Sequence, residues 1–140
     1  MNQLLLWDID GTLILGGNLG SKTLEAYFRE TYGWTEFRGV INPHGMTDPR
    51  IVDGIFEHFN HRPTDEERDD VLEKYAQALE VAMQNPDNGS RCLPGVPGIL
   101  NAPESPINWS QGLLTGNIQK AARIKLRFHN LWERFPFGSF

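Results

Sequence analysis

The sequence predicts an α/β protein with a Rossmann-like parallel sheet as its core and an α-helical segment inserted after the first strand. Three observations predict this fold class. An apolar run over residues 3–7 ends at Asp8, three amphipathic helix patterns follow it, and a second apolar run ends at Thr115. Strands separated by helices favour parallel pairing, because parallel strands need a long crossover connection.

The composition is that of an ordinary soluble globular protein, with 39% hydrophobic and 22% charged residues. The net charge of −5 argues against a partner bound through its phosphate backbone, so we expect no nucleic acid. A single cysteine, Cys92, allows neither an internal disulfide nor a cysteine-based zinc site. The first residues include no basic segment and too short an apolar run for a signal peptide or a membrane span. We therefore expect a cytoplasmic protein without membrane association, whose oligomeric state the sequence leaves open.

The first strand is predicted over residues 3–7, with the sequence QLLLW. A nearly continuous apolar run is typical of a strand that is buried on both faces, as in a parallel sheet covered by helices. We therefore predict a central, buried strand that ends at Asp8.

The first two helices of the insertion are predicted from their end signals and their apolar stripes. In the first helix we expect Ser21 to be the N-cap and Gly33 to end the helix. In the second helix we expect Asp48 to be the N-cap and Pro49 to occupy the first helical position. The apolar stripes are Leu24, Tyr27 and Phe28 in the first helix and Ile51, Val52, Ile55, Phe56 and Phe59 in the second.

A third helix is predicted after Thr64, which forms a capping box with Glu67. Its apolar positions recur at helical spacing up to Met83. Residues 85–91, with the sequence NPDNGSR, are rich in residues that favour turns, and we predict a linker there.

The remaining elements alternate between helix and strand. Residues 93–100 predict a short helix that Pro103 and Pro106 bring to an end. A second core strand ends within the sequence GLLTGN, and residues 118–130 predict a helix. The final residues, 136–140, are apolar enough to begin another strand.

Polar residues follow both predicted core strands. Ligands of open parallel sheets bind at the carboxyl ends of the strands, where Asp8, Asp10 and Thr115 fall. Two crowded carboxylates need a cation or a proton between them, and Mg²⁺ prefers oxygen ligands. One carboxylate can attack phosphorus while a neighbouring one transfers protons. We expect the Thr12 hydroxyl to bond back to an aspartate or to the backbone. The competing interpretation is that Asp-x-Asp-Gly is only a turn.

Two motifs resemble those of the haloacid dehalogenase superfamily. The segment LLLWDIDGTLI, residues 4–14, is similar to its nucleophile motif, an Asp-x-Asp-Gly-Thr after a hydrophobic strand. The segment LLTGN, residues 113–117, is similar to its second motif, a Thr or Ser at the end of the next core strand. The resemblance implies a core of residues 1–15 and 91–140 and a helical cap of residues 16–90.

The resemblance also implies roles for single residues. Asp8 looks like the nucleophile, and Asp10 looks like the general acid and base, with both aspartates as ligands of Mg²⁺. Thr115 is similar to the residue that hydrogen-bonds the transferring phosphoryl oxygens. Gly116 and Asn117 would support substrate binding through their backbone N–H groups, with Thr12 as a further substrate-binding candidate.

The superfamily also needs a lysine beside the nucleophile, and Lys125 is the candidate. The alternative is that Lys125 is a solvated helix lysine. In the cap, Gly45 and Thr47 resemble a substrate-facing loop, and Arg50 is a candidate for a substrate anion. The alternative for this loop is that Asp48 only begins a helix and that Arg50 is solvated.

The expected function is phosphate chemistry, because phosphatases and phosphomutases of the superfamily carry the aspartate at position 10 and the dehalogenases lack it. We expect a Mg²⁺-dependent phosphomonoester hydrolase that acts on a small phosphorylated metabolite, phosphoglycolate-like or sugar phosphate-like, through an aspartyl-phosphate. The alternatives are a phosphomutase with the same covalent step, a degenerate or truncated member that binds without turnover, and an unrelated doubly wound domain with an acidic turn.

The sequence departs from the superfamily pattern at its end, because the acidic fourth motif does not occur. We therefore expect the chain to be a fragment that lacks the C-terminal part of the core. Such a sheet would keep an exposed edge.

Overall fold

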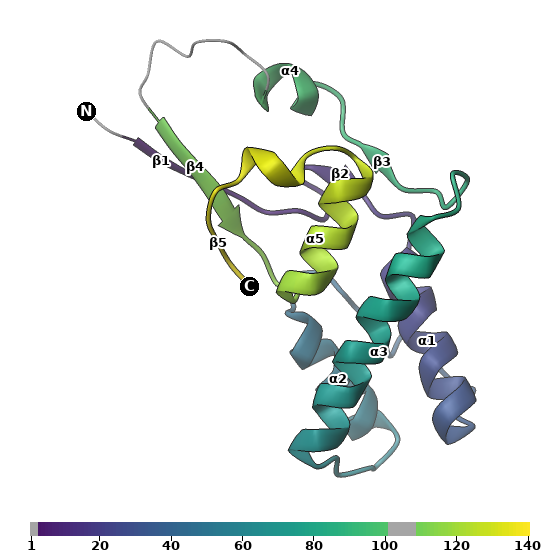
Figure 1. Cartoon of the computed structure of the whole chain (residues 1–140). Helices are drawn as coiled ribbons and strands as arrows, with labels where there is room; N and C mark the ends of the chain where they lie inside the picture. Colours follow the sequence, from purple (N-terminus) through teal and green to yellow (C-terminus); the bar gives the residue numbers. More distant parts are fainter. Residues whose placement is uncertain (1–2, 101–108) are drawn as a thin grey trace.

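The computed structural model of the chain describes residues 3–100 and 109–140. Its main sheet has three parallel strands in the order β1–β4–β5, with β1 at Gln3–Trp7, β4 at Trp109–Leu114 and β5 at Gly138–Ser139. Figure 1 shows β1 and β4 side by side, with Trp7 of β1 opposite Leu113 of β4. The predicted α/β class with a parallel sheet is confirmed.

The predicted burial of β1 on both faces is wrong. Leu4 and Leu6 are 62% and 44% exposed, whereas Leu5 and Trp7 between them are half-buried. Side chains alternate between the two faces of a strand, so one face of β1 packs inward and the described residues leave the other largely uncovered. The apolar run therefore indicates that the strand tends to be buried, but it does not indicate which face of the strand is covered by a neighbouring element.

A second, two-stranded sheet was not predicted. β2, Ile14–Leu15, pairs antiparallel with β3, Arg91–Cys92, so the predicted linker 85–91 ends in a strand. This pairing joins the two ends of the helical segment between them. The short helix α4 then covers Val96–Leu100, while Pro103 and Pro106 lie outside the described residues.

The helix α1 spans Leu19–Tyr32 and starts earlier than predicted. Asn18, in a left-handed conformation with φ 61°, precedes its first turn, and Ser21 lies inside the helix and not at its N-cap. Gly33 ends the helix as predicted, with φ 71° and its N–H donating to the carbonyl of Arg29.

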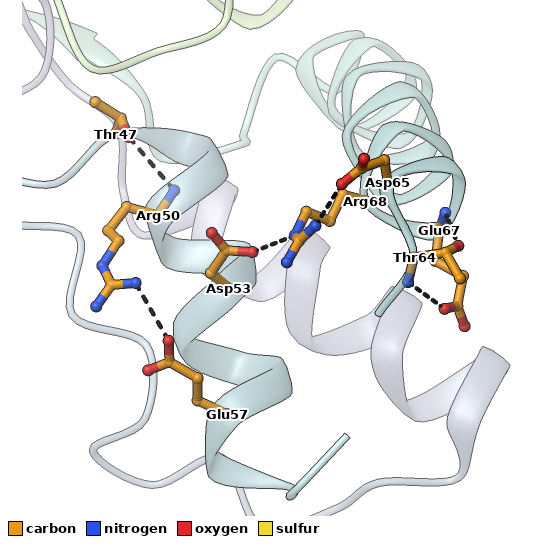
Figure 2. A network of polar contacts seen from close by, with 8 residues as sticks. All are labelled: Thr47, Arg50, Asp53, Glu57, Thr64, Asp65, Glu67 and Arg68. Atoms are coloured by element: carbon orange, nitrogen blue, oxygen red, sulfur yellow. Dashed lines mark hydrogen bonds and ion pairs between the residues drawn. The ribbon is translucent and has the colours of Figure 1, made fainter. Parts of the chain in front are cut away.

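The helix α2 spans Asp48–His58, and its N-cap is Thr47 rather than the predicted Asp48. The Thr47 hydroxyl accepts the backbone N–H of Arg50 at 3.4 Å, as Figure 2 shows. Asp48 therefore occupies the first helical position and Pro49 the second. The side chain of Asp48 is left for another partner.

The helix α3, Asp65–Met83, begins with the predicted capping box. The Thr64 hydroxyl accepts the backbone N–H of Glu67 at 3.1 Å, and the Glu67 carboxylate accepts the N–H of Thr64 at 2.8 Å. In this part of the molecule Arg68 pairs with Asp53 at 2.6 Å and joins α3 to α2 (Figure 2).

Two hydrophobic clusters hold the chain together. The first lies among α1, α2 and α3, where Phe28 stacks on Trp34 and meets Phe56 edge-on at 5.1 Å. The second lies under the main sheet and includes Ile9, Leu13, Ile14 and Leu113. The helix α5, Gln119–Phe128, packs against both through Ala121 in the first and Ala122 and Leu126 in the second.

Figure 1 shows α1, α2 and α3 gathered beyond the carboxyl ends of β1 and β4. After α5, the 3₁₀ turn η1 at Trp132–Arg134 leads to β5. Among the described residues, no helix combines the length and the apolar character needed to cross a membrane.

Candidate active site

A cavity of about 720 Å³ lies where the main strands end and the helices α1–α3 begin. Its size is within the range of small-molecule sites. It collects predicted site residues from four separate segments: Asp8 and Asp10 after β1, Gly45 and Thr47 before α2, Thr115, Gly116 and Asn117 after β4, and Lys125 on α5. The tertiary fold therefore brings most of the predicted site residues together.

The turn after β1 exposes both aspartates. Ile9 between them is fully buried, and its carbonyl accepts the backbone N–H groups of Leu13 at 2.9 Å and Ile14 at 3.1 Å. Gly11 turns the chain with φ 82°, a conformation that glycine adopts without steric cost. Because the core holds Ile9, the side chains of Asp8 and Asp10 are left at the surface of the cavity.

Lys125 is the centre of a polar network. Its Nζ donates to Oδ2 of Asp10 at 2.7 Å and to Oδ1 of Asn117 at 2.6 Å. The Asn117 amide donates in turn to Asp10 at 2.8 Å and to the Thr115 hydroxyl at 2.9 Å. Lys125 is 8% exposed, so the interpretation of it as a solvated helix lysine is wrong.

The side chain of Asn117 takes part in the network, and the sequence analysis did not predict this. Only its backbone N–H was expected to take part, whereas its amide bridges Asp10, Lys125 and Thr115. Asn117 is 5% exposed, and a buried amide needs such partners. In the sequence, the one feature that could have indicated this bridging role is the position of Asn117, two residues after Thr115 at the end of β4.

Asp48 joins the helical segment to the core. Its backbone N–H donates to the carbonyl of Gly116 at 2.7 Å, and its Oδ2 accepts the N–H of Ile118 at 2.8 Å. Ile118 is the N-cap residue of α5 and makes no side-chain cap of its own, so Asp48 caps that helix from outside. The interpretation that Asp48 only begins α2 missed this contact, because its partner lies 70 residues away.

The surroundings of Asp48 change its acidity. The side chain is 7% exposed, and burial raises the pKa of Asp48 above its ordinary value of 3.8. The hydrogen bond from the Ile118 N–H and the charge of Lys125 oppose this pKa shift, while the charge of Asp10 adds to it.

Two predicted site residues do not line the cavity. Arg50 is exposed and pairs with Glu57 at 3.2 Å on the outer surface of α2, as Figure 2 shows. Thr12 is also exposed, and its backbone N–H bonds to the carbonyl of Ile9 at 3.3 Å. Neither side chain is brought to the site by the fold.

The donors at the site fit a hard cation better than zinc. The described residues contain no group of three or more His, Cys, Asp or Glu that would hold a metal ion. Asp8 and Asp10 offer carboxylate oxygens, and Mg²⁺ is commonly bound by one or two carboxylates together with water and substrate phosphate. The residues present therefore fit Mg²⁺ with much of its coordination supplied by water or substrate.

Comparisons of structure find similar proteins, although no protein-family model and no curated protein sequence matches this chain. CbbY from Rhodobacter sphaeroides in complex with phosphate matches with a TM-score of 0.72 and 15% identity, over 99% of this chain and 63% of that one. A predicted phosphoglycolate phosphatase from Haemophilus somnus matches with a TM-score of 0.64 and 16% identity, over 99% of this chain and 60% of that one.

A third similar structure is YfnB from Bacillus subtilis, a candidate HAD-hydrolase bound to magnesium. It has a TM-score of 0.56 and 14% identity, over 97% of this chain and 63% of that one. The chain thus spans about six-tenths of the length of these structures. The described residues therefore have the fold of the matching portion of these haloacid dehalogenase-like hydrolase structures.

Proposed function

We propose that the chain is the nucleophile-bearing part of a Mg²⁺-dependent phosphomonoester hydrolase in which Asp8 receives the phosphoryl group. One observation carries this proposal. The exposed carboxylate of Asp8 shares a cavity with the network of Asp10, Asn117, Thr115 and Lys125. Within the described residues the structure gives the Asp8 side chain no hydrogen bond or ion pair, so its oxygens remain available to a substrate.

The proposed reaction has two steps. A carboxylate oxygen of Asp8 attacks phosphorus, the bond from phosphorus to the alcohol oxygen breaks, and the alcohol leaves with a proton from Asp10. Water then attacks the same phosphorus, gives its proton to Asp10 and releases phosphate from Asp8. When bound, Mg²⁺ neutralises negative charge on the phosphoryl oxygens.

The other residues of the network would position these groups. Lys125 and Asn117 donate hydrogen bonds to Asp10 at 2.7 and 2.8 Å. Asn117 is held in turn by Lys125 at 2.6 Å and by the Thr115 hydroxyl at 2.9 Å. Thr115 lines the cavity, and in this proposal its hydroxyl contacts a phosphoryl oxygen. We propose residues 16–90 as a cap that excludes water from the site, and residues 1–15 and 91–140 as its core.

The substrate in this proposal is a small phosphorylated metabolite. Two observations on similar proteins support it, since CbbY is complexed with phosphate and another match is named as a predicted phosphoglycolate phosphatase. The magnesium bound to YfnB supports the choice of metal.

The test is hydrolysis of para-nitrophenyl phosphate by the full chain, with and without Mg²⁺. We expect Mg²⁺-dependent release of phosphate that falls to background in Asp8→Asn. The matched control is Asp69→Asn, an exposed aspartate of α3 that does not line the cavity, and it should keep the activity. Hydrolysis that survives in Asp8→Asn would refute the covalent mechanism.

A second candidate function is a member that binds phosphate and Mg²⁺ without turnover. It is favoured by the small set of donors, because the described residues offer no group of three metal-binding side chains. Calorimetric binding of inorganic phosphate in the presence of Mg²⁺, without hydrolysis, would support it. A phosphomutase would share the step on Asp8 and would instead convert a sugar monophosphate into its isomer.

A further inference from the structure

We propose, on the basis of the phosphatase function above, that the substrate is the phosphate monoester of an uncharged and largely apolar alcohol. The observation is an imbalance within the cavity. Its phosphate end is polar and charged, whereas the walls that would surround a leaving group are mostly apolar. Among the other polar side chains that line the cavity are those of Asn18, Ser21, His44 and Ser90, and none of these is a lysine or an arginine.

The charges at the cavity are unfavourable for a second anionic group. Three carboxylates line it, Asp8, Asp10 and Asp48, and among the described residues Lys125 is the only lysine or arginine that does. The ammonium group of Lys125 is already bound to Asp10 and Asn117. A carboxylate or a second phosphate on the substrate would therefore meet negative charge without a free cation to offset it.

Three cationic side chains of the neighbouring helices pair with carboxylates away from the cavity. Arg50 pairs with Glu57 on α2, and Arg68 of α3 pairs with Asp53 of α2 and with Asp65 (Figure 2). Neither arginine lines the cavity. Lys120 of α5 pairs with Glu73 of α3 and does not line the cavity. These ion pairs leave none of the three cations directed at a substrate.

The apolar wall comes from several elements. Leu15, Leu19, Ile41 and Met46 line the cavity with part of their surface exposed to it. Behind them lie side chains with at most 8% exposure, which close the cavity from the helix side: Leu24, Ile51, Tyr75, Leu79 and Met83. An aliphatic or aromatic leaving group would lose apolar surface to this wall, which is favourable in proportion to the area buried.

Tyr75 keeps this wall neutral. Burial raises the pKa of Tyr75 well above its ordinary value, and the charges of Asp48 and Asp10 raise it further. Its hydroxyl packs against Gly20, where an added Cβ would lie only 3.0 Å from the oxygen. Tyr75 therefore presents at most an uncharged hydroxyl to the leaving group.

The test measures binding to the full chain by calorimetry with Mg²⁺ at pH 8. The probes are inorganic phosphate, the n-alkyl phosphates from ethyl to hexyl, 2-phosphoglycolate and propane-1,3-diol bisphosphate. We expect the affinity to rise by up to roughly fourfold for each added methylene. We expect 2-phosphoglycolate and the bisphosphate to bind at least about tenfold more weakly than ethyl and propyl phosphate, respectively.

The outcomes separate this inference from the proposed function. Tighter binding of 2-phosphoglycolate than of ethyl phosphate, or no gain with chain length, would overturn the inference while leaving the phosphatase proposal standing. Failure of every probe to bind, inorganic phosphate included, would overturn both. Because binding is the readout, the ranking is informative even if the chain hydrolyses none of the esters.

A variant of the wall gives an independent check. Met46 is 40% exposed, so Met46→Lys places a cation at the cavity with little risk to folding, and Met46→Gln is the neutral control. We expect Met46→Lys to improve binding of 2-phosphoglycolate relative to ethyl phosphate by roughly fivefold, and Met46→Gln to leave that ratio unchanged. An equal ratio in both variants would place the leaving group elsewhere and overturn the assignment of this wall.

Discussion

Replacing Asp48 with alanine tests the contact that joins the helical segment to the core. The substitution keeps the backbone hydrogen bond to Gly116 and removes the carboxylate that accepts the Ile118 N–H at 2.8 Å. The first turn of α5 then loses its external cap, because Ile118 has no side-chain cap of its own. Asp48→Asn is the matched variant, since it has the same size and keeps an acceptor.

The expected loss follows from two opposing contributions. A hydrogen bond to a charged group contributes about 1.5–3 kcal/mol, and a buried N–H without an acceptor costs about 1–3 kcal/mol. Against this, the raised pKa of Asp48 shows that its buried charge is itself unfavourable. We therefore expect Asp48→Ala to lower the free energy of unfolding by about 1–3 kcal/mol at pH 7, and Asp48→Asn by less than about 1 kcal/mol.

The same residue gives a pH dependence of known sign. Burial raises the pKa of Asp48 above 3.8, so the folded state binds its proton more readily than the unfolded state does. The part of the stability that is linked to this raised pKa is fully present below pH 3.8 and is lost as the pH rises through the folded-state pKa, whereas the hydrogen bond from Ile118 remains. Because asparagine does not titrate, the stability of Asp48→Asn relative to the wild type should increase over this interval.

Urea unfolding of the wild type and both variants at several pH values from 4 to 7 measures these effects. The reasoning would be refuted by an Asp48→Ala variant within about 0.5 kcal/mol of the wild type at pH 7. It would also be refuted if the relative stability of Asp48→Asn decreased as the pH rises.

Three further substitutions, two of them with a matched control, have defined outcomes. Lys125→Met removes two hydrogen bonds to the buried network and should cost about 1–3 kcal/mol in urea unfolding, whereas Lys120→Met, from an exposed ion pair, should cost less than about 1 kcal/mol. Gly116→Ala would place a Cβ 2.4 Å from the carbonyl oxygen of Met46 and should lower the free energy of unfolding by about 1–3 kcal/mol. The control Gly54→Ala, which has open space inside α2, should raise it by roughly 0.5–1 kcal/mol. Equal effects of the two substitutions would contradict the close approach at Gly116. Thr64→Ala removes the capping box and should lower the free energy of unfolding, measured by calorimetry, by about 0.5–2 kcal/mol. An unchanged free energy of unfolding would mean that the cap contributes nothing to stability.

Local patterns in the sequence predicted the elements that depend on neighbouring residues. The capping box of Thr64 and Glu67 and the helix end at Gly33 are contacts within four residues, so the sequence states them directly. The aspartates after β1 and the threonine after β4 were also predictable, because parallel strands bring their carboxyl ends to one edge of the sheet.

The predictions that failed, and the choice that the sequence left open for Lys125, concern the partners of polar side chains. Thr47 took the cap of α2, and Asp48 became free to cap α5 across 70 residues. Lys125, which looked equally like a solvated lysine, bonds to Asp10 across 115 residues, and Arg50 turns to Glu57 on its own helix. In each case the local sequence was compatible with two different partners for the side chain.

By itself, the sequence determined where the helices and the strands of the main sheet form and which strand ends carry polar groups, because propensity, periodicity and capping act over a few residues. The pairing of β2 with β3 was not among its predictions. Only the tertiary structure decided which face of β1 is covered, which partner each charged side chain has, and that the cavity walls are apolar beside the charged strand ends. These outcomes depend on how the helical segment packs against the main sheet and α5. The periodicity of apolar residues indicates that a face is buried, but it does not identify the surface that covers this face.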